Sequence, residues 1–365
     1  TLCKQKKYRE FSQKHIKQMK RENFQKIVDG KQIDLFELSN KNGMKVFITN
    51  YGAKIVSILA ADKNGNFDDM VLGFDTIDEY LQKETYFGTV CGRFANRIKD
   101  GKFTLEGKDY SFVQNNGTNH LHGGNVGFNQ KIWEIKNVTS TELELVYYSP
   151  DGEEGYPGNL LTTVTYSLND DNELKVNYKA ASDKTTIVNF CQHSFFNIHG
   201  AGNGDVLNQY LMINADFYTP IDETQCPNGE VRKVDNTLMD FRQPVKIADR
   251  INADFDQFTI GKGIDNNWVV RKAQAGDLAF AASVYDEETG RLLEMFTTQP
   301  GVQVYAGNWV EKNKGKGGKQ YDERYAICLE AQGFPNSPNM PHFPSPVLKK
   351  GRIYDETCIY KFSVK

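Results

Sequence analysis

The stretch LTTVTYSLNDDNELKVNY, residues 161–178, decides the fold class. Its first part, residues 161–166, is rich in the β-branched residues that favour strands. Its last part, residues 174–178, alternates apolar and polar side chains with the period of two expected for a half-buried strand. Between them, residues 169–172 read Asn-Asp-Asp-Asn, a cluster of turn-forming residues. The stretch therefore predicts antiparallel β structure.

The same pattern recurs along most of the chain. Extended runs occupy residues 45–49, 55–59, 143–148 and 292–297, and Gly, Asn and Asp lie between such runs. Outside the N-terminal tail, only short stretches such as residues 76–81 have helical character. Many strands with few helices predict an all-β protein, a large antiparallel β-sandwich. We expect a single domain over residues 25–365, preceded by a basic extension over residues 1–24.

Composition and charge narrow the classes of function. The chain has 365 residues, of which 39% are hydrophobic and 25% charged, as in a soluble globular protein. A formal net charge of −3 argues against nucleic-acid binding, and no apolar run reaches the length of a membrane span. Residues 1–30 hold nine lysine and arginine residues against three acidic ones, which we interpret as a solvated extension.

The six cysteines give weak information about the compartment. None are spaced as CxxC, so a zinc site of that kind is not predicted, and several lie in apolar runs. We interpret them as free thiols, which favours a reducing compartment, and we expect a cytoplasmic protein. Because the chain begins at Thr1, a periplasmic or secreted location is the alternative if an upstream leader was removed.

Two titratable residues stand at the ends of strand-like runs. His193 follows the extended run 185–190, and a histidine held there is either a satisfied core residue or a group that exchanges protons near neutral pH. Glu330 closes the apolar run 326–329. A carboxylate in that position is costly unless it is ion-paired or used as a base. The sequence alone leaves both alternatives open.

Further polar residues could bind hydroxyl groups. Asn96 and Arg97 lie in the glycine-containing segment 92–98, and His122 precedes two glycines that allow a close approach of a ligand. Asp265 lies in a turn, where it either accepts hydrogen bonds from a diol or caps the turn. Gln303 lies in a strand-like run, with a donor and an acceptor suited to sugar hydroxyls. Arg97 has a structural alternative as a salt-bridge partner at a sheet edge.

Three tempting motifs are weaker. His120 and His122 would share a face if the segment were extended, which raises a metal site, but no acidic residue follows at a suitable spacing. Glu153 and Glu154 resemble the paired carboxylates of glycosidases, yet adjacent residues seldom face one substrate. Residues 314–319 are rich in Gly and Lys but lack the order of a phosphate-binding loop.

Five motifs together resemble those of the aldose 1-epimerase (galactose mutarotase) family. They are, in order, GRFANR at residues 92–97, LHGG at 121–124, DGEEGYPG at 151–158, HSFFN at 193–197 and LE at 329–330. The resemblance covers residues 23–365 and leaves out the basic tail. Departures are Cys191-Gln192 before the histidine, where an Asn directly before it is common, and Gly333, where the family often has a bulkier residue.

The resemblance implies a β-supersandwich fold and interconversion of the α and β anomers of free aldoses such as galactose and glucose. It implies His193 as general acid and Glu330 as general base, with no cofactor and no metal. It also implies a sugar-hydroxyl binding set, consisting of Asn96, Arg97, His122, Asp265 and Gln303. Alternatives are a hexose-6-phosphate mutarotase and a non-catalytic carbohydrate-binding domain. We expect a monomer or a weak homodimer.

Overall fold

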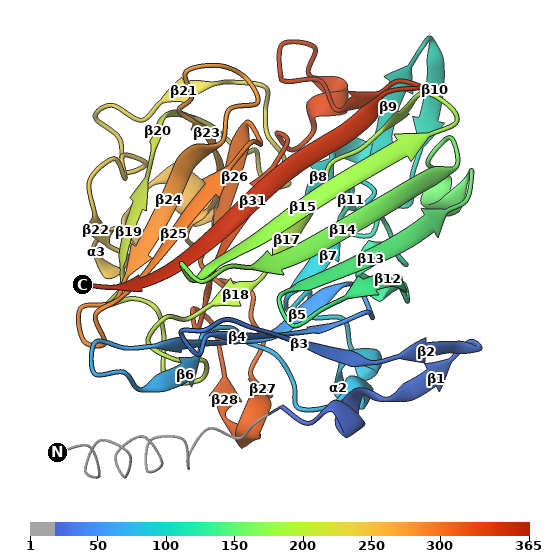
Figure 1. The fold of residues 1–365 in the computed structure, drawn as a ribbon. Coiled ribbons are helices and arrows are strands. Elements are labelled where there is room, and N and C mark those ends of the chain that lie inside the picture. Colours follow the sequence, from blue (N-terminus) through green and yellow to red (C-terminus); the bar gives the residue numbers. More distant parts are fainter. Residues whose placement is uncertain (1–18) are drawn as a thin grey trace, which may run out of the picture.

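A nine-stranded sheet forms one layer of the molecule (Figure 1). The computed structural model describes residues 19–365. In the order of the sheet, its strands are β12 (Glu134–Val138), β13 (Glu142–Ser149), β14 (Leu160–Leu168), β15 (Glu173–Ser182), β31 (Ile353–Val364), β25 (Arg291–Thr297), β24 (Ala279–Tyr285), β19 (Tyr210–Ile213) and β22 (Val245–Lys246). The hairpin of β14 and β15 contains residues 161–178 and confirms the strands and the turn predicted there.

A six-stranded sheet carries much of the pocket described below. In spatial order its strands are β18 (Phe195–Phe196), β29 (Ile327–Gln332), β26 (Gly301–Tyr305), β23 (Asp265–Val270), β20 (Ala215–Thr219) and β21 (Arg232–Lys233). Its strand β29 is buried along its whole length. Such strands read as continuous apolar runs, so a single charged residue inside one stands out.

A four-stranded sheet and several strand pairs complete the β structure. The four strands are β3 (Leu35–Ser39), β4 (Lys45–Thr49), β5 (Lys54–Ala61) and β6 (Phe67–Asp69). The pairs are β1 (Lys26–Val28) with β2 (Lys31–Ile33), β9 (Lys102–Leu105) with β10 (Lys108–Ser111), β8 (Arg97–Ile98) with β11 (His120–Leu121), β7 (Thr89–Cys91) with β17 (Cys191–His193), β16 (Thr186–Ile187) with β30 (Val347–Leu348), and β27 (Asn313–Lys314) with β28 (Gln320–Tyr321).

Helices are few and short in the part of the chain that the structure describes. The α-helices are α2 (Ile77–Gln82), α3 (Ala248–Ile251) and α4 (Asp256–Gly261), and the 3-10 helices are η1 (Arg21–Phe24), η2 (Lys99–Gly101), η3 (Phe128–Gln130), η4 (Glu153–Gly155), η5 (Lys316–Gly318) and η6 (Ser337–Asn339). Helix α2 confirms the predicted helical stretch. Thr76 and Glu79 form a capping box at its N-terminus.

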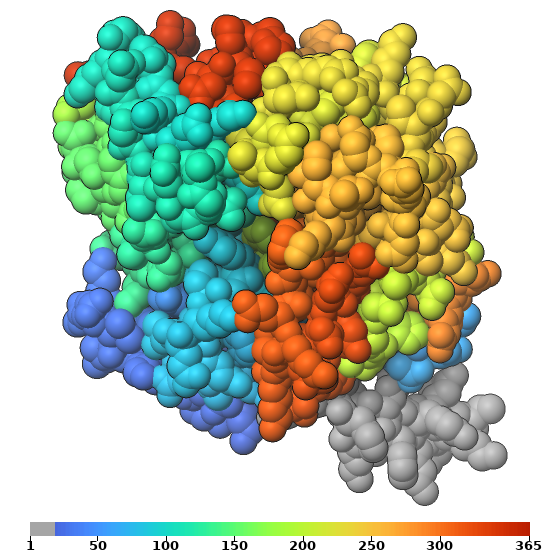
Figure 2. Space-filling model, turned by 180° about the vertical axis from the view of Figure 1, so that it is seen from behind, coloured from blue at the N-terminus to red at the C-terminus, as the bar shows by residue number. Residues whose placement is uncertain are grey.

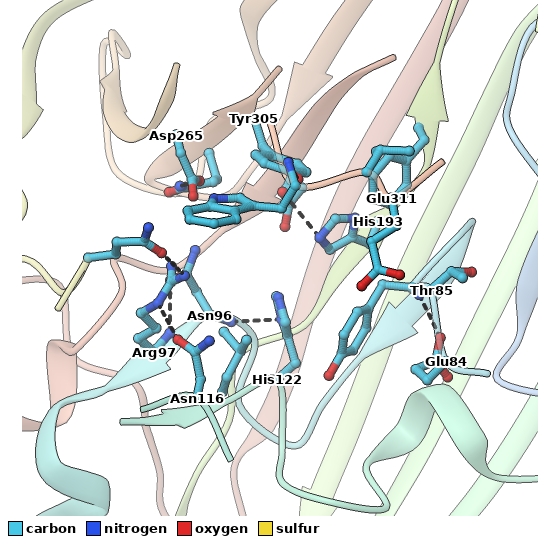
Figure 3. Close-up of a pocket in the computed structure, with 18 of the residues that line it drawn as sticks. Glu84, Thr85, Asn96, Arg97, Asn116, His122, His193, Asp265, Tyr305 and Glu311 are labelled. Atoms are coloured by element: carbon cyan, nitrogen blue, oxygen red, sulfur yellow. Dashed lines mark hydrogen bonds and ion pairs between the residues drawn. The ribbon is translucent and has the colours of Figure 1, made fainter. Parts of the chain in front are cut away.

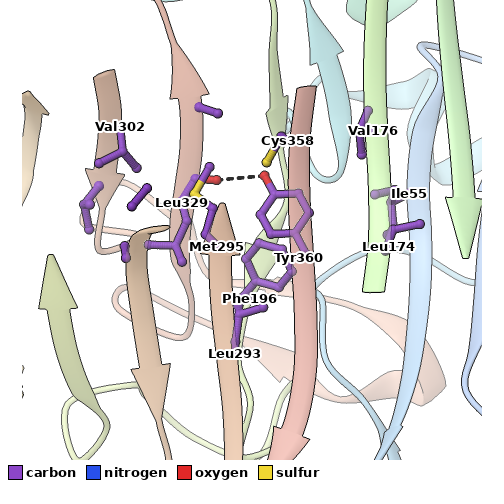
Figure 4. Packing of buried hydrophobic residues seen from close by; sticks show 14 of the residues in the cluster. Ile55, Leu174, Val176, Phe196, Leu293, Met295, Val302, Leu329, Cys358 and Tyr360 are labelled. Atoms are coloured by element: carbon purple, nitrogen blue, oxygen red, sulfur yellow. Dashed lines mark hydrogen bonds between the residues drawn. The ribbon is translucent and has the colours of Figure 1, made fainter. Parts of the chain in front are cut away.

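The largest core cluster fills the space between the sheets (Figure 4). Strand β15 shows why: its buried and exposed residues alternate, and Leu174 and Val176 point inward. From β31, Tyr360 donates its hydroxyl to the carbonyl of Leu329 on β29 at 2.8 Å, which ties the two large sheets together. All pairings between the named strands are antiparallel, as predicted for a large β-sandwich, apart from one isolated parallel bridge between Phe94 and Asn189.

The N-terminal segment is only partly described. Residues 1–18 of the predicted basic extension lie outside the described residues. Within the rest of it, Phe24 is fully buried, and Arg21 donates to the Asp34 carboxylate from Nε at 2.8 Å. Among residues 19–365 we find no helix long and apolar enough to cross a membrane.

Candidate active site

A pocket of about 760 Å³ opens on the face shown in Figure 2. There, segments from the early, middle and late parts of the chain meet around a hollow. All seven residues that the sequence singled out line this pocket, although they come from six separate regions: Asn96, Arg97, His122, His193, Asp265, Gln303 and Glu330.

Three neighbouring strands of the six-stranded sheet supply the carboxylates and the glutamine. Gln303 on β26 lies directly opposite Glu330 on β29, and Asp265 on β23 lies opposite Tyr305 on β26. Because residues i and i+2 of a strand share a face, Gln303 and Tyr305 point to the same side. The register therefore brings Asp265, Gln303 and Glu330 to one face, and Gln303 donates to Asp265 at 2.7 Å.

A second strand pair brings the histidine to the carboxylate. His193 ends β17, and its Nε2 lies 3.6 Å from Oε1 of Glu330 (Figure 3). The other oxygen of Glu330 accepts a hydrogen bond from the thiol of Cys191 at 3.4 Å. The side chains of His193 and Glu330 are only 7% and 2% exposed. The site thus holds an imidazole and a carboxyl group in contact at the buried end of the pocket.

Burial moves the pKa values of this pair in opposite directions. Desolvation, reinforced by the nearby Asp265 carboxyl group, raises the pKa of Glu330 to about 8. Desolvation, with a smaller contribution from Lys54, lowers the pKa of His193 to about 4. Each shift favours the neutral form of its group. Between these values the free pair therefore holds one proton, on Glu330, within reach of the histidine.

The adjoining loop fixes the tautomer of a second histidine. The backbone N–H of Asn96 donates to Nδ1 of His122 at 3.1 Å. The pKa of His122 is lowered well below its usual value, mainly by burial. The ring is therefore neutral and carries its proton on Nε2, where it can donate to a ligand.

Arg97 and Asp265 present a donor and an acceptor to the pocket. Nε of Arg97 donates to Asn116 at 2.9 Å and Nη2 to Gln225 at 2.6 Å, so both flanking amides orient the guanidinium. Burial raises the pKa of Asp265, whereas Arg97 and the bond from Gln303 act in the opposite direction. Among residues 19–365, Arg97 forms no ion pair of the kind expected at a sheet edge, and Asp265 is the first residue of β23 and not part of a turn as expected.

The condition under which His120 and His122 would share a face, an extended segment, is not met. His120 continues β11, but His122 has a φ of 51°, in the left-handed region, which turns its side chain away from that of its neighbour. His120 instead lies 2.9 Å from the carbonyl of Val113 and 2.7 Å from the hydroxyl of Tyr156. The two rings therefore do not face one metal ion.

The carboxylates Glu153 and Glu154 are structural, as expected. Glu153 accepts hydrogen bonds from Tyr147 and Ser149 and pairs with Lys131. Glu154 accepts the backbone N–H groups of residues 125 and 126. Neither residue lines the pocket.

Several residues of the pocket were not predicted. Tyr86, Phe195, Gln225, Tyr305 and Trp309 also line it. Phe195 lies inside the HSFFN motif, where its neighbours could have indicated it. Gln225 and Trp309 come from irregular segments whose positions only the tertiary structure defines.

One group of described side chains has the chemistry of a metal site. Ligand atoms of His193, Cys328 and Glu330 lie within 4.8 Å of one another, and all three residues are buried. Two of the three form the imidazole–carboxyl pair. A cation bound there would take the place of the proton that the pair shares.

The fold and the site define a class of protein: a large antiparallel β-sandwich with a buried imidazole–carboxyl pair facing a polar pocket. The family model described as aldose 1-epimerase matches residues 34–361. The bovine protein named galactose mutarotase is 42% identical over 333 residues, covering 91% of this chain and 94% of that relative. The Escherichia coli protein named aldose 1-epimerase is 34% identical over 336 residues, covering 92% and 96%.

Solved structures show the same similarity. An aldose epimerase homologue from C. elegans superposes with a TM-score of 0.84 at 31% identity, covering 90% of this chain and 98% of that one. A galactose 1-epimerase from Lactobacillus acidophilus gives a TM-score of 0.80 at 28% identity, covering 93% and 97%. The chain belongs to the aldose 1-epimerase family, which confirms the resemblance found in its motifs.

Proposed function

We propose that this protein is an aldose 1-epimerase that interconverts the α and β anomers of free hexoses such as galactose and glucose. The observation that carries the proposal is the contact of 3.6 Å between His193 Nε2 and Glu330 Oε1 inside a pocket lined by hydroxyl-binding groups. Ring opening of a hemiacetal needs one group to remove a proton and another to supply one. This pair offers both at one place.

The reaction begins when the proton of the pair passes from Glu330 to His193. The Glu330 carboxylate then removes the proton of the C1 hydroxyl while His193 donates its proton to the ring oxygen. The bond between C1 and the ring oxygen breaks, and C1 becomes the aldehyde carbon of an open-chain sugar. Protons and electrons balance without any further reactant, because one proton is taken and one is given.

The second half reverses these roles. Rotation about the C1–C2 bond turns the other face of the aldehyde toward the C5 hydroxyl. His193 removes the proton of that hydroxyl as it attacks C1, and Glu330 returns a proton to the carbonyl oxygen. The ring closes as the opposite anomer, and the return of the proton from His193 to Glu330 restores the starting state of the pair.

The polar groups around the pair bind the sugar hydroxyls. His122 and Arg97 present N–H donors, and Asp265 together with Gln303 presents acceptors and donors fixed by their mutual bond. Such oriented polar groups hold a sugar ring while C1 and the ring oxygen face the pair.

The charges of the pocket favour a neutral sugar over a hexose phosphate. Among the described lining residues the basic ones are Lys83 and Arg97, and Lys83 is ion-paired with Glu311. The acidic ones are Glu84, Glu223, Asp265, Glu311 and Glu330. A phosphate would need converging cations, which this set does not supply.

Polarimetry of freshly dissolved α-galactose tests the proposal, with α-glucose and glucose 6-phosphate measured in parallel. We expect the rotation to approach equilibrium faster with protein for the free sugars. Glu330→Gln and His193→Asn should each lower kcat by roughly 10²–10⁴-fold, because each removes one proton-transfer group.

Circular dichroism of both variants serves as the control for folding. Variants that are folded and nearly as active as the wild type would overturn the assignment of the pair. A wild-type protein that binds galactose without accelerating mutarotation would instead be a carbohydrate-binding domain.

A further inference from the structure

Three rings form a cluster on the wall of the pocket. The ring centroids of Tyr86 and His122 are 4.9 Å apart, those of Tyr86 and His193 are 6.0 Å apart, and those of the two histidines are 5.2 Å apart. Tyr86 stacks on His193 with an interplanar angle of 28°. Tyr86 therefore contacts both the proposed acid and a sugar-binding histidine.

His193 depends on such packing for its orientation. Among residues 19–365, no other residue supplies a hydrogen-bond partner to its Nδ1, which is buried. His122 differs, since its Nδ1 is fixed by the backbone of Asn96. With no such bond at Nδ1, the ring is oriented by the Glu330 contact at Nε2 and by the side chains stacked against its faces, Phe195 and Tyr86.

Tyr86 is itself held in an unusual backbone conformation. Its φ is 59°, in the left-handed region that costs free energy for a residue with a Cβ. Its backbone N–H donates to Oε1 of Glu84 at 2.6 Å (Figure 3). That carboxylate also accepts a bond of 2.9 Å from Asn129, so two donors fix it from different directions.

A buried lysine completes the anchor. The side chain of Lys54 is 1% exposed, and its Nζ lies 3.2 Å from both oxygens of Glu84. The ammonium group also faces the rings of Tyr51 and Tyr80 at 5.4 and 6.0 Å. Burying such an ion pair is expensive and adds little stability compared with apolar residues of the same size. Its position directly behind the loop that carries Tyr86 suggests a different use.

We propose that Tyr86 is a positioning residue for His193 and His122, and that the ion pair of the buried Lys54 with the partly buried Glu84 is the anchor that fixes it there. The loop that carries Tyr86 connects the ion pair to the strand of His193. Lys54 begins β5, and Gly88, two residues after Tyr86, donates its N–H to the carbonyl of His193 at 3.0 Å. The inference rests on the proposed mutarotase function, because it assigns a role to residues that support the acid.

The prediction for the ring itself separates positioning from a structural role. Tyr86→Ala should lower kcat by roughly 10- to 100-fold with a smaller change in KM, because a misplaced proton donor slows the chemical step. Tyr86→Phe keeps the ring and should restore most of kcat. Loss of the ring also admits water to His193, which eases its charging, so the acidic limb of the pH–rate profile should move to higher pH.

The other groups that face His193 keep their chemical identity in these variants. They are Glu330 at 3.6 Å, His122, Tyr305, the thiol of Cys328 and the charge of Lys54. A shift of the acidic limb in Tyr86→Ala therefore reports on the ring. Titration of the His193 ring protons by NMR gives the same pKa without using activity.

The anchor is tested by a double substitution, since either single change would leave a buried charge without its partner. Lys54→Met with Glu84→Leu removes both charges and the acceptor of the Tyr86 N–H. We expect this variant to fold and to show a lower kcat and a higher acidic-limb pKa, each change smaller than in Tyr86→Ala. The Lys54 charge, which lowers the pKa of His193, is lost as well and acts in the same direction.

A matched control is available in the same chain. Lys316 and Asp69 form a similar pair of a buried lysine with a partly buried carboxylate, with Nζ 2.6 Å from Oδ2, and neither residue lines the pocket. Lys316→Met with Asp69→Leu should change Tm while leaving kcat and the pH profile at wild-type values. If this control altered the profile as the anchor variant does, the effect would be one of general stability and the inference would fail.

The outcomes distinguish the inference from the proposed function. A wild-type protein without mutarotase activity would overturn the proposed function. An active wild type whose Tyr86→Ala variant keeps the same kcat, acidic limb and His193 titration would overturn the positioning role alone.

Discussion

At the scale of single residues, the site is governed by the cost of burying charge. Glu330 and His193 are both buried, and in each case desolvation is the main cause of the pKa shift. The thiol of Cys191 acts against this for Glu330, because a hydrogen bond to the carboxylate favours its charged form. Cys191, which the sequence marked as a departure from the family pattern, is thus part of the environment of Glu330.

The pKa values of the pair predict the pH dependence of the reaction. Below the pKa of about 4 for His193 the pair holds two protons and no base remains. Above the pKa of about 8 for Glu330 it holds none, and the acid is missing. We therefore expect kcat/KM to follow a bell-shaped curve with limbs near these values, which belong to the pair as a whole.

The measurement is polarimetry of α-galactose across the pH range. Because mutarotation of free sugars is itself accelerated by acid and base, a reaction without protein is subtracted at each pH. A rate that stays constant from pH 4 to 9 would contradict the one-proton pair.

At the scale of elements, the sequence predicted which residues form strands better than it predicted which residues lie next to one another in the folded protein. The alternation in residues 174–178 reports directly on burial, and β15 follows it. By contrast, Arg93 and Arg97 lie in one motif and look equivalent in sequence. Arg93 is buried away from the pocket and donates to Ser149 and to the carbonyl of Gly158, whereas Arg97 faces the pocket. Only the tertiary fold separates these two roles.

The family resemblance indicated roles for residues that the local sequence patterns left undecided. Composition and periodicity left His193 and Glu330 open between structural and catalytic roles, because their contact joins residues 137 positions apart in the chain. Tyr86 was not predicted, since its importance comes from a left-handed backbone angle and from ring contacts across the pocket. Neither feature leaves a periodic signal in the sequence.

The turn that carries His122 gives a prediction at this scale. Gly123 has a φ of 89°, and a Cβ there would lie 1.9 Å from the carbonyl oxygen of Gly92. Gly123→Ala must therefore displace the turn, and we expect a raised KM for galactose together with a lower Tm.

Gly107→Ala is the matched control for this turn. Gly107 has a φ of 76°, but no atom lies within 4 Å of its added Cβ. The control should lose only the free energy of a left-handed alanine, about 1–2 kcal/mol, and keep its KM. Equal KM values in the two variants would show that the turn does not position His122.

At the scale of the whole molecule, the pocket is built where three parts of the β structure meet. The six-stranded sheet supplies Asp265, Gln303 and Glu330, the pair of β7 and β17 supplies His193, and the pair of β8 and β11 leads into the loops of Asn96 and His122. Contacts such as that between Tyr360 and Leu329 hold the sheets in register with one another. A rigid sandwich of this kind can keep a carboxyl group buried at a cost to stability.

That cost predicts how stability depends on pH. The pKa of Glu330 is raised from 4.5 to about 8 in the folded protein, so the folded state binds more protons than the unfolded state between these values. Stability contributed by this group is therefore complete below about pH 4.5 and is lost as pH rises toward 8. Glu330→Gln, which is neutral at all pH values and keeps the size of the side chain, removes the dependence.

We expect thermal melts to show nearly equal Tm values for the wild type and Glu330→Gln near pH 4, below the unfolded pKa of 4.5. At pH 8.5 the variant should be the more stable, by roughly 2 °C or more, although it has lost its activity. Asp355→Asn serves as the control, because Asp355 lies on the exposed part of β31 and its side chain is 52% exposed. If the difference in Tm between wild type and Glu330→Gln did not grow with pH, Glu330 would not be held neutral by its burial. Burial of this carboxyl group would then not be what lowers the free energy of unfolding at high pH.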